Sequence, residues 1–429
     1  MDYTPHTELD VTEMLERIGA ESVEALFEPI PSNLRLGRRL DISAPLSEIE
    51  VSELMGSMAN ENVATDRLVC FAGGGAYDHY IPAAVRALAY RSEFVTSYTP
   101  YQPELSQGVL GALFEYQTMI CELTGMDVAN ASLYDGASAL VEAVNLAASA
   151  TGRKKIAVTD ALNPNYREVL ETFGVGLGYE FTSPSDLEGA ACLIVAQPNF
   201  FGMIEDIASH ADAAHAAGAL LIVHYDLMTA GVLESPGKLG ADIVTAEGQS
   251  LGNDLNFGGP YLGVFATRME HVRRVPGRIC GATVDVHGEP GFVLTLQARE
   301  QHIRREKANS NVCTNQTLMA VVATVYLSWL GPQGLRELGE TCMLRSAQAA
   351  ESLAGVAGCA LKFDGPWFKE FVLQVPGDAS DVVRAMGERG FLVGPVLADS
   401  PDCLLICVTE RRTPDDIERL AKTLAEAIS

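Results

Sequence analysis

Basic residues are scarce in this sequence of 429 residues, which has 30 lysines and arginines against 56 aspartates and glutamates. The formal net charge is -26 at pH 7, and the sequence pI is about 4.6. Nucleic acids and anionic membrane surfaces are polyanions, so a chain of this charge has no general affinity for either. We therefore expect neither nucleic acid nor a membrane as a partner, and the acidic surplus is typical of a soluble protein.

Long apolar segments are also lacking. The longest apolar run, residues 319–330, is too short to span a bilayer, which requires about 20 apolar residues. The first residues are polar and do not form a basic segment followed by an apolar run, so no secretory signal is predicted. We therefore expect a soluble, cytoplasmic protein, and its length allows one or two domains with sizeable cores.

Cysteine pairs at metal-binding or redox spacing are absent from the sequence. None of the nine cysteines forms a C-x-x-C motif, and several lie inside apolar runs, as Cys192 does. An odd number of cysteines in such positions indicates reduced, buried thiols rather than disulfides or zinc ligands. The sequence therefore predicts no metal site.

What the sequence does contain is an alternation of short apolar strands and amphipathic helices. Helical spacing is found at residues 105–123, 135–152, 205–217 and 315–330. Strands are predicted at residues 156–159, 177–181, 192–196, 220–225, 243–246 and 262–266. Short apolar strands separated by helices indicate a mostly parallel sheet that is covered on both faces.

Three domains are predicted. Residues 1–70 carry helical signals broken by prolines and form an N-terminal, mostly helical arm whose apolar positions need a surface to cover. Residues 71–330 form a large α/β domain, and residues 331–429 form a smaller C-terminal α+β domain. This layout resembles that of fold-type-I pyridoxal phosphate enzymes, an analogy that fixes no function by itself.

More specific are several long, ungapped segments. They are YDHYIP at 77–82, YTPYQPELSQG at 98–108, ICELTGMDVAN at 120–130, QPNFFG at 197–202, PGK at 236–238 with GAD at 240–242, and FVLTLQAREQHIRR at 292–305. Together with their register, they resemble the alpha subunit (subunit 1) of two-chain glycine decarboxylases, the P-protein of the glycine cleavage system, over nearly the whole chain.

The resemblance implies a reaction and a set of partners. In this family glycine loses CO2 with the help of pyridoxal phosphate, and the remaining aminomethyl group passes to the lipoyl arm of the carrier H-protein. The cofactor takes up the electron pair left by decarboxylation, and the protein supplies geometry and charge. The resemblance further implies a beta subunit (subunit 2) in an α2β2 heterotetramer, which binds pyridoxal phosphate covalently, whereas this chain does not.

A lysine placed to hold the cofactor is missing. Where the family's catalytic subunit carries His-Lys, this chain carries Gln249 and Ser250. Lys238 precedes the strand at 243–246, although the cofactor lysine of fold-type-I enzymes follows that strand, and Lys307 lies in a charged segment. The remaining lysines, Lys369 in the small domain among them, are not placed for chemistry. We therefore expect the covalent step in the partner chain.

Two acidic positions and one glycine-rich segment are weaker candidates. Asp226 follows the strand at 220–225, where a fold-type-I enzyme places the carboxylate that pairs with the pyridinium nitrogen, but a structural cap is the favoured interpretation. Asp135 opens a helix whose N-terminus favours anions, although its own charge would repel a phosphate. The glycines at 73–75 lack the lysine and hydroxyl of a phosphate loop and indicate a tight turn.

The loop at residues 98–107 is the predicted contribution of this chain to a neighbour's active site. Prolines stiffen the loop, and its tyrosines and carboxamides can orient a small polar substrate such as glycine. A rigid entry into the following helix is the alternative. The residues expected to act in trans are Tyr98, Thr99, Tyr101, Gln102, Glu104, Ser106 and Gln107.

A basic segment stands out in an otherwise acidic chain. Arginine binds carboxylate and phosphate through two parallel hydrogen bonds, so the segment suits an anion or an acidic partner surface. Internal ion pairing with Glu300 and Glu306 is the alternative. The residues are Arg299, His302, Arg304 and Arg305, with Lys307 after them.

Two other functions remain open at this point. A self-sufficient pyridoxal phosphate lyase or aminotransferase would bind the cofactor on Lys238 or Lys307. A non-catalytic interaction scaffold would tolerate replacement of the loop tyrosines and the arginines as long as the complex assembled.

Overall fold

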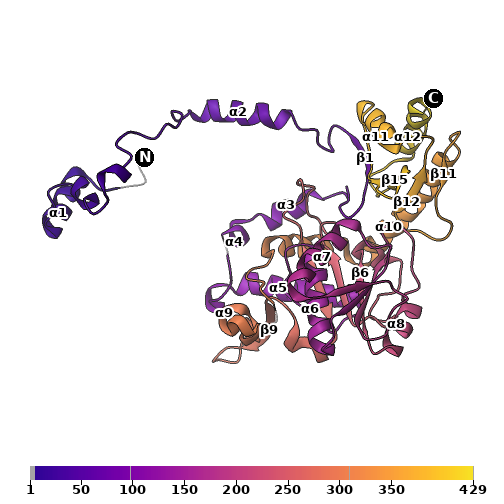
Figure 1. The fold of residues 1–429 in the computed structure, drawn as a ribbon, viewed down its shortest axis with the longest axis horizontal. Helices are drawn as coiled ribbons and strands as arrows, with labels where there is room; N and C mark the ends of the chain where they lie inside the picture. The colour runs from indigo at the N-terminus through magenta and orange to yellow at the C-terminus, as the bar shows by residue number, and fades with distance from the viewer. Residues whose placement is uncertain (1–4, 97, 309, 429) are drawn as a thin grey trace. The chain divides into compact units, whose positions relative to one another are not determined.

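The computed structural model describes residues 5–96, 98–308 and 310–428, and the chain divides into two compact units, residues 1–63 and 64–429 (Figure 1). The first unit contains helices α1 (Glu8–Ile18) and α2 (Glu48–Asn60), with two short 3-10 helices, η1 (Glu24–Phe27) and η2 (Ser32–Leu34). Capping boxes at Thr7 and Ser47 start both α-helices. None of the described side chains of this unit is buried, so its helices depend on local capping rather than on a core.

A seven-stranded sheet forms the centre of the second unit. It is built from β2 (Val128–Ala129), β3 (Lys155–Val158), β4 (Glu180–Thr182), β5 (Ala190–Gln197), β6 (Leu220–Tyr225), β7 (Ile243–Glu247) and β8 (Gly263–Thr267). The strand order is β2-β8-β7-β6-β5-β3-β4, and only the pairs that involve β8 are antiparallel. All residues of β5 are buried, as expected of a strand covered on both faces.

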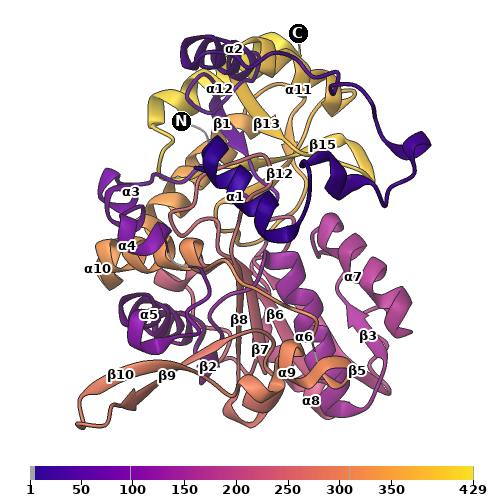
Figure 2. The same ribbon diagram turned by 90° about the vertical axis from the view of Figure 1, so that its left-hand side faces the viewer.

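Helices cover both faces of this sheet (Figure 2). They are α3 (Ala83–Ala89), α4 (Ser92–Val95), α5 (Gln107–Thr124), α6 (Gly136–Thr151), α7 (Pro164–Leu177), α8 (Ile207–Ala216) and α10 (Thr317–Ala354). Side chains of α6 and α7 share one core with Ile194 and Ile222. Side chains of α5, α8 and α10 share the other core with Leu193 and Val223. The alternation of neighbouring strand residues between two cores is the period of two that a strand imposes.

An antiparallel ribbon and short helices lie beside α5. The ribbon consists of β9 (Ile279–Val284) and β10 (Pro290–Thr295), and it is followed by η6 (Gln297–Arg299), α9 (Gln301–Arg304) and η7 (Arg305–Lys307). Phe292 packs on Phe114 of α5, with ring centroids 5.1 Å apart. The ribbon projects from the large lobe in Figure 2.

The C-terminal lobe has its own core. Its sheet has the order β11-β12-β15-β14, and a parallel pair of β1 with β13 lies beside it. Strand β1 comes from the start of the unit, so the lobe is assembled from both ends of residues 64–429. The elements are β1 (Val69–Ala72), β11 (Ala360–Leu361), β12 (Glu370–Gln374), α11 (Ala379–Glu388), β13 (Phe391–Gly394), β14 (Val396–Leu397), β15 (Ser400–Cys407) and α12 (Pro414–Ala427).

Helix α10 connects the two lobes and crosses the boundary expected at residue 331. The helix kinks there, because Gly331 has a non-helical backbone (φ 63°, ψ 179°) and Pro332 follows it. By length and composition alone α10 is apolar enough to cross a membrane, and 50% of its most apolar window is buried inside the protein. That burial is the property of a core helix.

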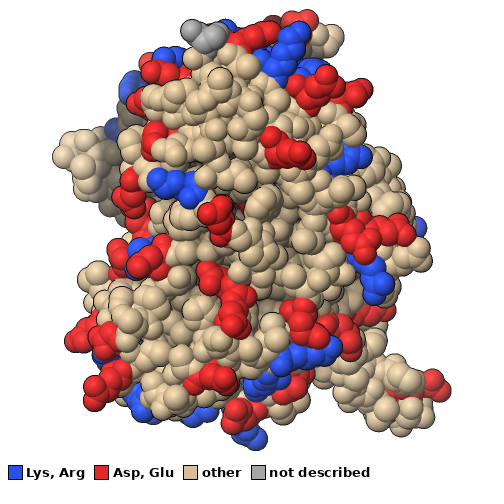
Figure 3. Space-filling model, turned by 90° about the vertical axis from the view of Figure 1, so that its right-hand side faces the viewer, with Lys and Arg blue, Asp and Glu red and all other residues tan. Residues whose placement is uncertain are grey.

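Most predicted elements are present, with shifts at their ends. The strand expected at 177–181 is shorter, because Leu177 is still the last residue of α7 and β4 begins at Glu180. Gly178 separates them in the left-handed conformation (φ 67°), which ends the helix. On the face shown in Figure 3, acidic side chains are widely spread and basic side chains lie among them, in keeping with the net charge of -26.

Candidate functional site: the pocket at the sheet end and the tyrosine loop

A pocket lies at the carboxyl ends of β5, β6 and β7, where open α/β sheets bind their ligands. We call it the sheet-end pocket. Its cavity has a volume of about 60 Å³, well below the roughly 300 Å³ at which small-molecule sites begin. Its wall carries three acids, Asp226, Glu247 and Glu370, together with Gly74, Gly75, Tyr77, Asn163, Tyr166, Asn199 and His224.

Asp226 follows β6 and is engaged on both sides. One of its oxygens accepts a hydrogen bond from the backbone N–H of Met228 at 3.0 Å, so the expected cap is present. Its other oxygen lies 2.8 Å from Nζ of Lys369. Burial by itself lowers the pKa of this lysine, but Asp226 raises it above its ordinary value, so Lys369 stays charged.

Lys369 reaches Asp226, a wall residue of the sheet-end pocket, from the C-terminal lobe, a contact that the sequence analysis did not predict. Its side chain is 1% exposed, and its Nζ lies 3.5 Å from the centre of the Tyr77 ring. A cation in this position is attracted by the electrons of the ring face. Lys369 directly precedes β12 of the C-terminal lobe. Among the described residues, it is the lysine that forms an ion pair with Asp226.

Glu247 is the last residue of β7, and its carboxylate binds three backbone amides. It accepts hydrogen bonds from Gly136 at 2.9 Å, Gln249 at 2.9 Å and Leu262 at 3.0 Å. Gly136 is the first residue of α6, whose N-terminus carries a partial positive charge. Burial raises the pKa of Glu247 to about 7 despite these donors.

Glu370 closes the opposite wall of the sheet-end pocket. Its carboxylate accepts hydrogen bonds from the backbone N–H of Gly74 at 2.7 Å and from the hydroxyl of Tyr77 at 2.8 Å. The glycine turn is required here, because a Cβ on Gly73 would lie 2.1 Å from a carboxylate oxygen of Glu370. Burial raises the pKa of Glu370 to about 7.

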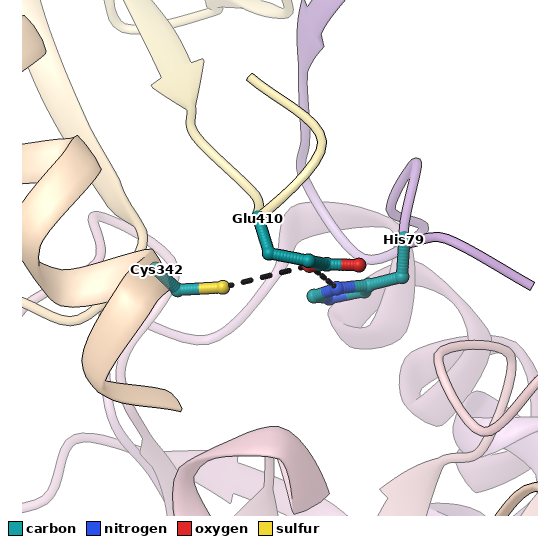
Figure 4. A group of neighbouring side chains, drawn as sticks. All are labelled: His79, Cys342 and Glu410. Atoms are coloured by element: carbon teal, nitrogen blue, oxygen red, sulfur yellow. Dashed lines mark hydrogen bonds and ion pairs between the residues drawn. The ribbon is translucent and has the colours of Figure 1, made fainter. Parts of the chain in front are cut away.

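Behind Lys369, the network continues to His79, Glu410 and Cys342 (Figure 4). Lys369 Nζ lies 3.1 Å from Nε2 of His79, and Nδ1 of His79 lies 2.6 Å from Glu410. Burial raises the pKa of Glu410, but His79 and a backbone N–H outweigh it and lower the value to about 2.

The Cys342 thiol points to Glu410 at 3.7 Å, so a histidine, a cysteine and a glutamate cluster together. Ligand atoms around a tetrahedral zinc lie about 3.3 Å or more apart, given bond lengths of about 2.0–2.3 Å. The 2.6 Å separation of His79 and Glu410 is therefore that of a hydrogen bond. The neighbouring Lys369 ammonium would also repel a metal cation.

The residues that replace His-Lys have structural partners. Gln249 donates to the backbone oxygens of Tyr77 at 3.2 Å and Asn253 at 2.8 Å, and it accepts from the Tyr77 N–H at 2.8 Å. Ser250 is 4% exposed. Lys238 is a surface residue paired with Glu234 at 3.1 Å, and Lys307 is exposed. Neither of these two lysines lines the sheet-end pocket.

Pyridoxal phosphate does not fit this pocket. The helix N-terminus that could bind its phosphate already holds Glu247, and the carboxylate that could pair with its ring nitrogen already holds Lys369. Asp135, whose carboxylate caps α6 through the Ser138 N–H at 2.7 Å, adds negative charge beside the same amides. The donor set therefore disagrees with the cofactor that the fold family uses, and we derive no chemical step in this pocket.

Residues 98–107, the tyrosine loop, lie on the surface before α5. Tyr98 and Tyr101 are 79% and 50% exposed, and Gln102, Glu104 and Gln107 are exposed as well. Thr99 and Ser106 are partly buried. None of these residues lines the sheet-end pocket, so the loop presents its polar groups outward rather than into the chain's own site.

Arg278 anchors the tyrosine loop and was missed by the sequence analysis. It is 3% exposed, and its guanidinium donates to Asn315 at 2.8 Å, to the carbonyl of Cys313 at 2.8 Å and to the Tyr101 hydroxyl at 3.4 Å. The Tyr101 ring also packs edge-on against His302, with centroids 5.9 Å apart. One arginine therefore fixes the tyrosine from below.

The basic segment divides into an inward and an outward part. Arg299 donates to the backbone carbonyls of Val275, Gly277 and Leu296, which leaves it a structural role. His302, Arg304 and Arg305 are exposed. The expected anion or partner site therefore has three exposed members, of which His302 packs against Tyr101 and lies 3.8 Å from the Glu300 carboxylate.

Comparisons with known proteins agree with one another. The family model "Glycine cleavage system P-protein" matches residues 1–424. A relative from Desulforamulus reducens that is named "Probable glycine dehydrogenase (decarboxylating) subunit 1" is 49% identical over 99% of both chains. An inhibitor-bound crystal structure of glycine decarboxylase (P-protein) superposes with a TM-score of 0.94 at 44% identity, covering 100% of both chains.

The predicted fold-type-I class is confirmed by these neighbours. A glutamate decarboxylase of Lactobacillus brevis shares the fold at 13% identity, with a TM-score of 0.67 over 94% of this chain. The resemblance to subunit 1 is likewise confirmed over the full length of the sequence. The chain therefore belongs to the glycine cleavage system P-protein family and is a subunit 1 of glycine decarboxylase.

Proposed function

We propose that this chain completes the active site of a lysine-bearing partner, the beta subunit of a two-chain glycine decarboxylase. The partner binds pyridoxal phosphate covalently, glycine loses CO2 there, and the aminomethyl group is passed to lipoylated H-protein. The observation that carries the proposal is the pair Gln249 and Ser250 directly after β7, in a chain that is similar to subunit 1 over its whole length. The enzyme would work in the cytoplasm.

The tyrosine loop is the part of this chain that we assign to the partner's active site. Tyr101 has its hydroxyl beside Arg278, and a buried guanidinium holds the ring at a defined position. Such fixed donors and acceptors can orient a small polar substrate without a cost for ordering them at each turnover. In this assembly Tyr101 is a catalytic-site residue, and Arg278 is the residue that positions it.

The exposed cations beside the loop suit an acidic surface. His302, Arg304 and Arg305 are exposed on α9 and η7, in a chain whose formal net charge is -26. We assign them to binding a substrate carboxylate or the docking carrier, because guanidinium groups bind carboxylates through paired hydrogen bonds.

The first unit supports the assembly. Its described residues include many exposed apolar side chains, among them Leu9, Met14, Ile18, Leu26 and Phe27. Because none of the described residues of this unit is buried, its apolar side chains contribute hydrophobic stabilisation only when a surface covers them. We infer that the beta subunit provides that surface in an α2β2 complex. Light scattering with and without the beta subunit checks this, and a stable monomer that ignores the partner contradicts it.

The test uses the reconstituted pair of subunits with H-protein. Exchange of CO2 with glycine should require both chains, and reduction with borohydride followed by peptide mapping should label a lysine of the partner only. Stoichiometric labelling of Lys238, Lys307 or Lys369 would establish a self-sufficient enzyme instead. Exchange by the beta subunit alone at the full rate would leave this chain the scaffold role.

A further inference from the structure

The sheet-end pocket presents the features by which a phosphorylated pyridine could be recognised. The N-terminus of α6 has backbone amides and a positive partial charge that suit a phosphate, and Asp226 has a carboxylate that suits a ring N–H. In this chain both features already bind a group of the protein itself. These groups of the protein take the two positions that a phosphate and a ring nitrogen would need.

Glu247 behaves as a built-in anion. Its carboxylate takes three backbone N–H donors at 2.9–3.0 Å, one of them from the first residue of α6. Converging backbone amides at a helix N-terminus form the usual cradle of a phosphate group. The fit is close, because a Cβ on Gly136 would lie 2.9 Å from the side chain of Glu247.

Lys369 behaves as a built-in cation. Its ammonium lies 2.8 Å from Asp226 and 3.5 Å from the centre of the Tyr77 ring. A protonated pyridine nitrogen would need the same carboxylate. The lysine is also held from behind by His79, so it is part of a network that joins the C-terminal lobe to the sheet.

Charge makes the exclusion stronger than size alone. An incoming phosphate carries a charge of about -1.5 to -2 near neutral pH. It would meet Asp226, Glu247 and Glu370 on the wall and Asp135 at the start of α6. Lys369, which reaches Asp226, is already paired with it. Like charges placed together in a desolvated site weaken binding strongly.

We infer that two side chains of the protein take the place of a ligand in the sheet-end pocket, Glu247 at the phosphate position and Lys369 at the pyridinium position. The chain therefore does not bind phosphorylated pyridines, even those that need no covalent bond. The missing lysine is then not the cause of the exclusion. This inference concerns the chain itself and holds whether or not the proposed partnership is correct.

Pyridoxamine 5′-phosphate is the suitable probe, because it needs no lysine. Titration calorimetry of the full chain at about pH 8, where Glu247 is ionised, should show no saturable binding. Glu247→Ala frees the three amides, and the variant should bind the probe at least about tenfold more tightly than the parent. Adding Lys369→Met should strengthen binding again by freeing Asp226. Inorganic phosphate should compete with the probe in the Glu247→Ala variant.

Two controls keep the test decisive. Glu188→Ala removes an exposed acid outside the pocket and should leave the probe unbound. Glu247→Gln keeps a hydrogen-bond acceptor without the charge, and it should bind more weakly than Glu247→Ala. Circular dichroism confirms that each variant is folded. Binding by the parent as tight as by Glu247→Ala overturns the inference, and so does a folded Glu247→Ala variant that binds neither the probe nor phosphate.

Discussion

The sheet-end pocket and the tyrosine loop place polar groups in opposite ways. In the pocket, every acid on the wall has a partner from the same chain, and the space that remains is about 60 Å³. In the loop, Tyr98, Tyr101 and Glu104 are exposed. Arg278 donates to the Tyr101 hydroxyl, and Gln107 ties the loop to β10. The acids of the pocket are therefore bound by groups of the same chain, whereas the loop leaves the side chains of Tyr98 and Glu104 exposed to a neighbour.

The difference agrees with the proposed function, in which the chain's own pocket is closed and its surface loop serves a partner. The acids of the sheet-end pocket are bound by groups of the chain itself, and the ion pair of Lys369 with Asp226 joins the C-terminal lobe to the sheet. Groups that could meet a substrate are held on a stiff surface segment instead. Substitutions in the two regions should therefore act on different measured quantities, stability in the pocket and turnover in the loop.

The largest effect is expected from Lys369→Met, which leaves Asp226 buried without its cation. Removal of one partner of a buried ion pair typically lowers the free energy of unfolding by about 3–5 kcal/mol. Urea denaturation followed by circular dichroism measures this change. Lys362→Met is the matched control, because Lys362 is exposed in the same lobe and its loss should stay within about 0.5 kcal/mol. Equal effects of the two variants would contradict the network.

The pH dependence of stability should differ between Glu247 and Glu410. The pKa of Glu247 is raised to about 7, above the ordinary 4.5, so the folded state holds the extra proton and stability falls as pH rises from 4.5 to 7. Glu247→Gln should remove this loss and become more stable relative to the parent over that window, by up to about 3 kcal/mol.

Glu410 supplies the opposite sign. Its pKa is lowered to about 2, so its contribution is present above pH 4.5 and is lost as pH falls toward 2. Glu410→Gln should therefore be most destabilising at neutral pH and nearly harmless near pH 2. Denaturation curves collected across this pH range test both variants. If the stability of the Glu247→Gln and Glu410→Gln variants changed with pH in the same way, the opposite pKa shifts of the two glutamates would be contradicted.

The strands that carry the sheet-end pocket could be predicted from the sequence, whereas the side chains that meet in the pocket could not. Strands β5, β6 and β7 are apolar on both faces, so their runs could be found from composition alone. The direction in which α10 continues beyond Pro332 could not, because packing between the lobes decides it.

The charged contents of the pocket required the fold. Lys369 lies more than a hundred residues beyond Asp226 in sequence, and only the folded lobe brings them to 2.8 Å. A signal did exist, because Lys369 and Glu370 open an apolar strand, and Glu247 ends one. Charged residues inside such runs are rarely buried without a partner, which would have justified a search for one.

Tyr101→Phe should sharpen the comparison on the side of the loop. If the hydroxyl meets the reacting substrate in the partner's site, its loss should lower glycine-dependent CO2 exchange by about 10²-fold in the assembled complex. The free energy of unfolding should change by less than about 0.5 kcal/mol, since the loop is at the surface. Tyr90→Phe, at a tyrosine that is likewise 50% exposed, is the control and should exchange at the parental rate. Parental exchange by Tyr101→Phe in an intact complex would leave the loop a rigid helix entry.

The smallest effect is expected from Gln107→Ala, which tests whether activity depends on the attachment of the loop to β10 as well as on the side chains that the loop exposes. Gln107 donates to the carbonyls of Pro103 at 2.7 Å and Phe292 at 2.8 Å, and it accepts from the Phe292 N–H at 2.8 Å, so it ties the loop to β10. Removal of these exposed hydrogen bonds should cost about 1 kcal/mol of stability. Gln107→Ala leaves the Tyr101 hydroxyl unchanged, so the rate of CO2 exchange should fall by clearly less than with Tyr101→Phe. Gln107→Glu retains the acceptor for the Phe292 N–H, and its exchange rate should fall less than that of Gln107→Ala. If Gln107→Ala instead reduced exchange as strongly as Tyr101→Phe without loss of stability, Gln107 itself would have to contact the substrate. Its assignment as a residue that only holds the loop against β10 would then be wrong.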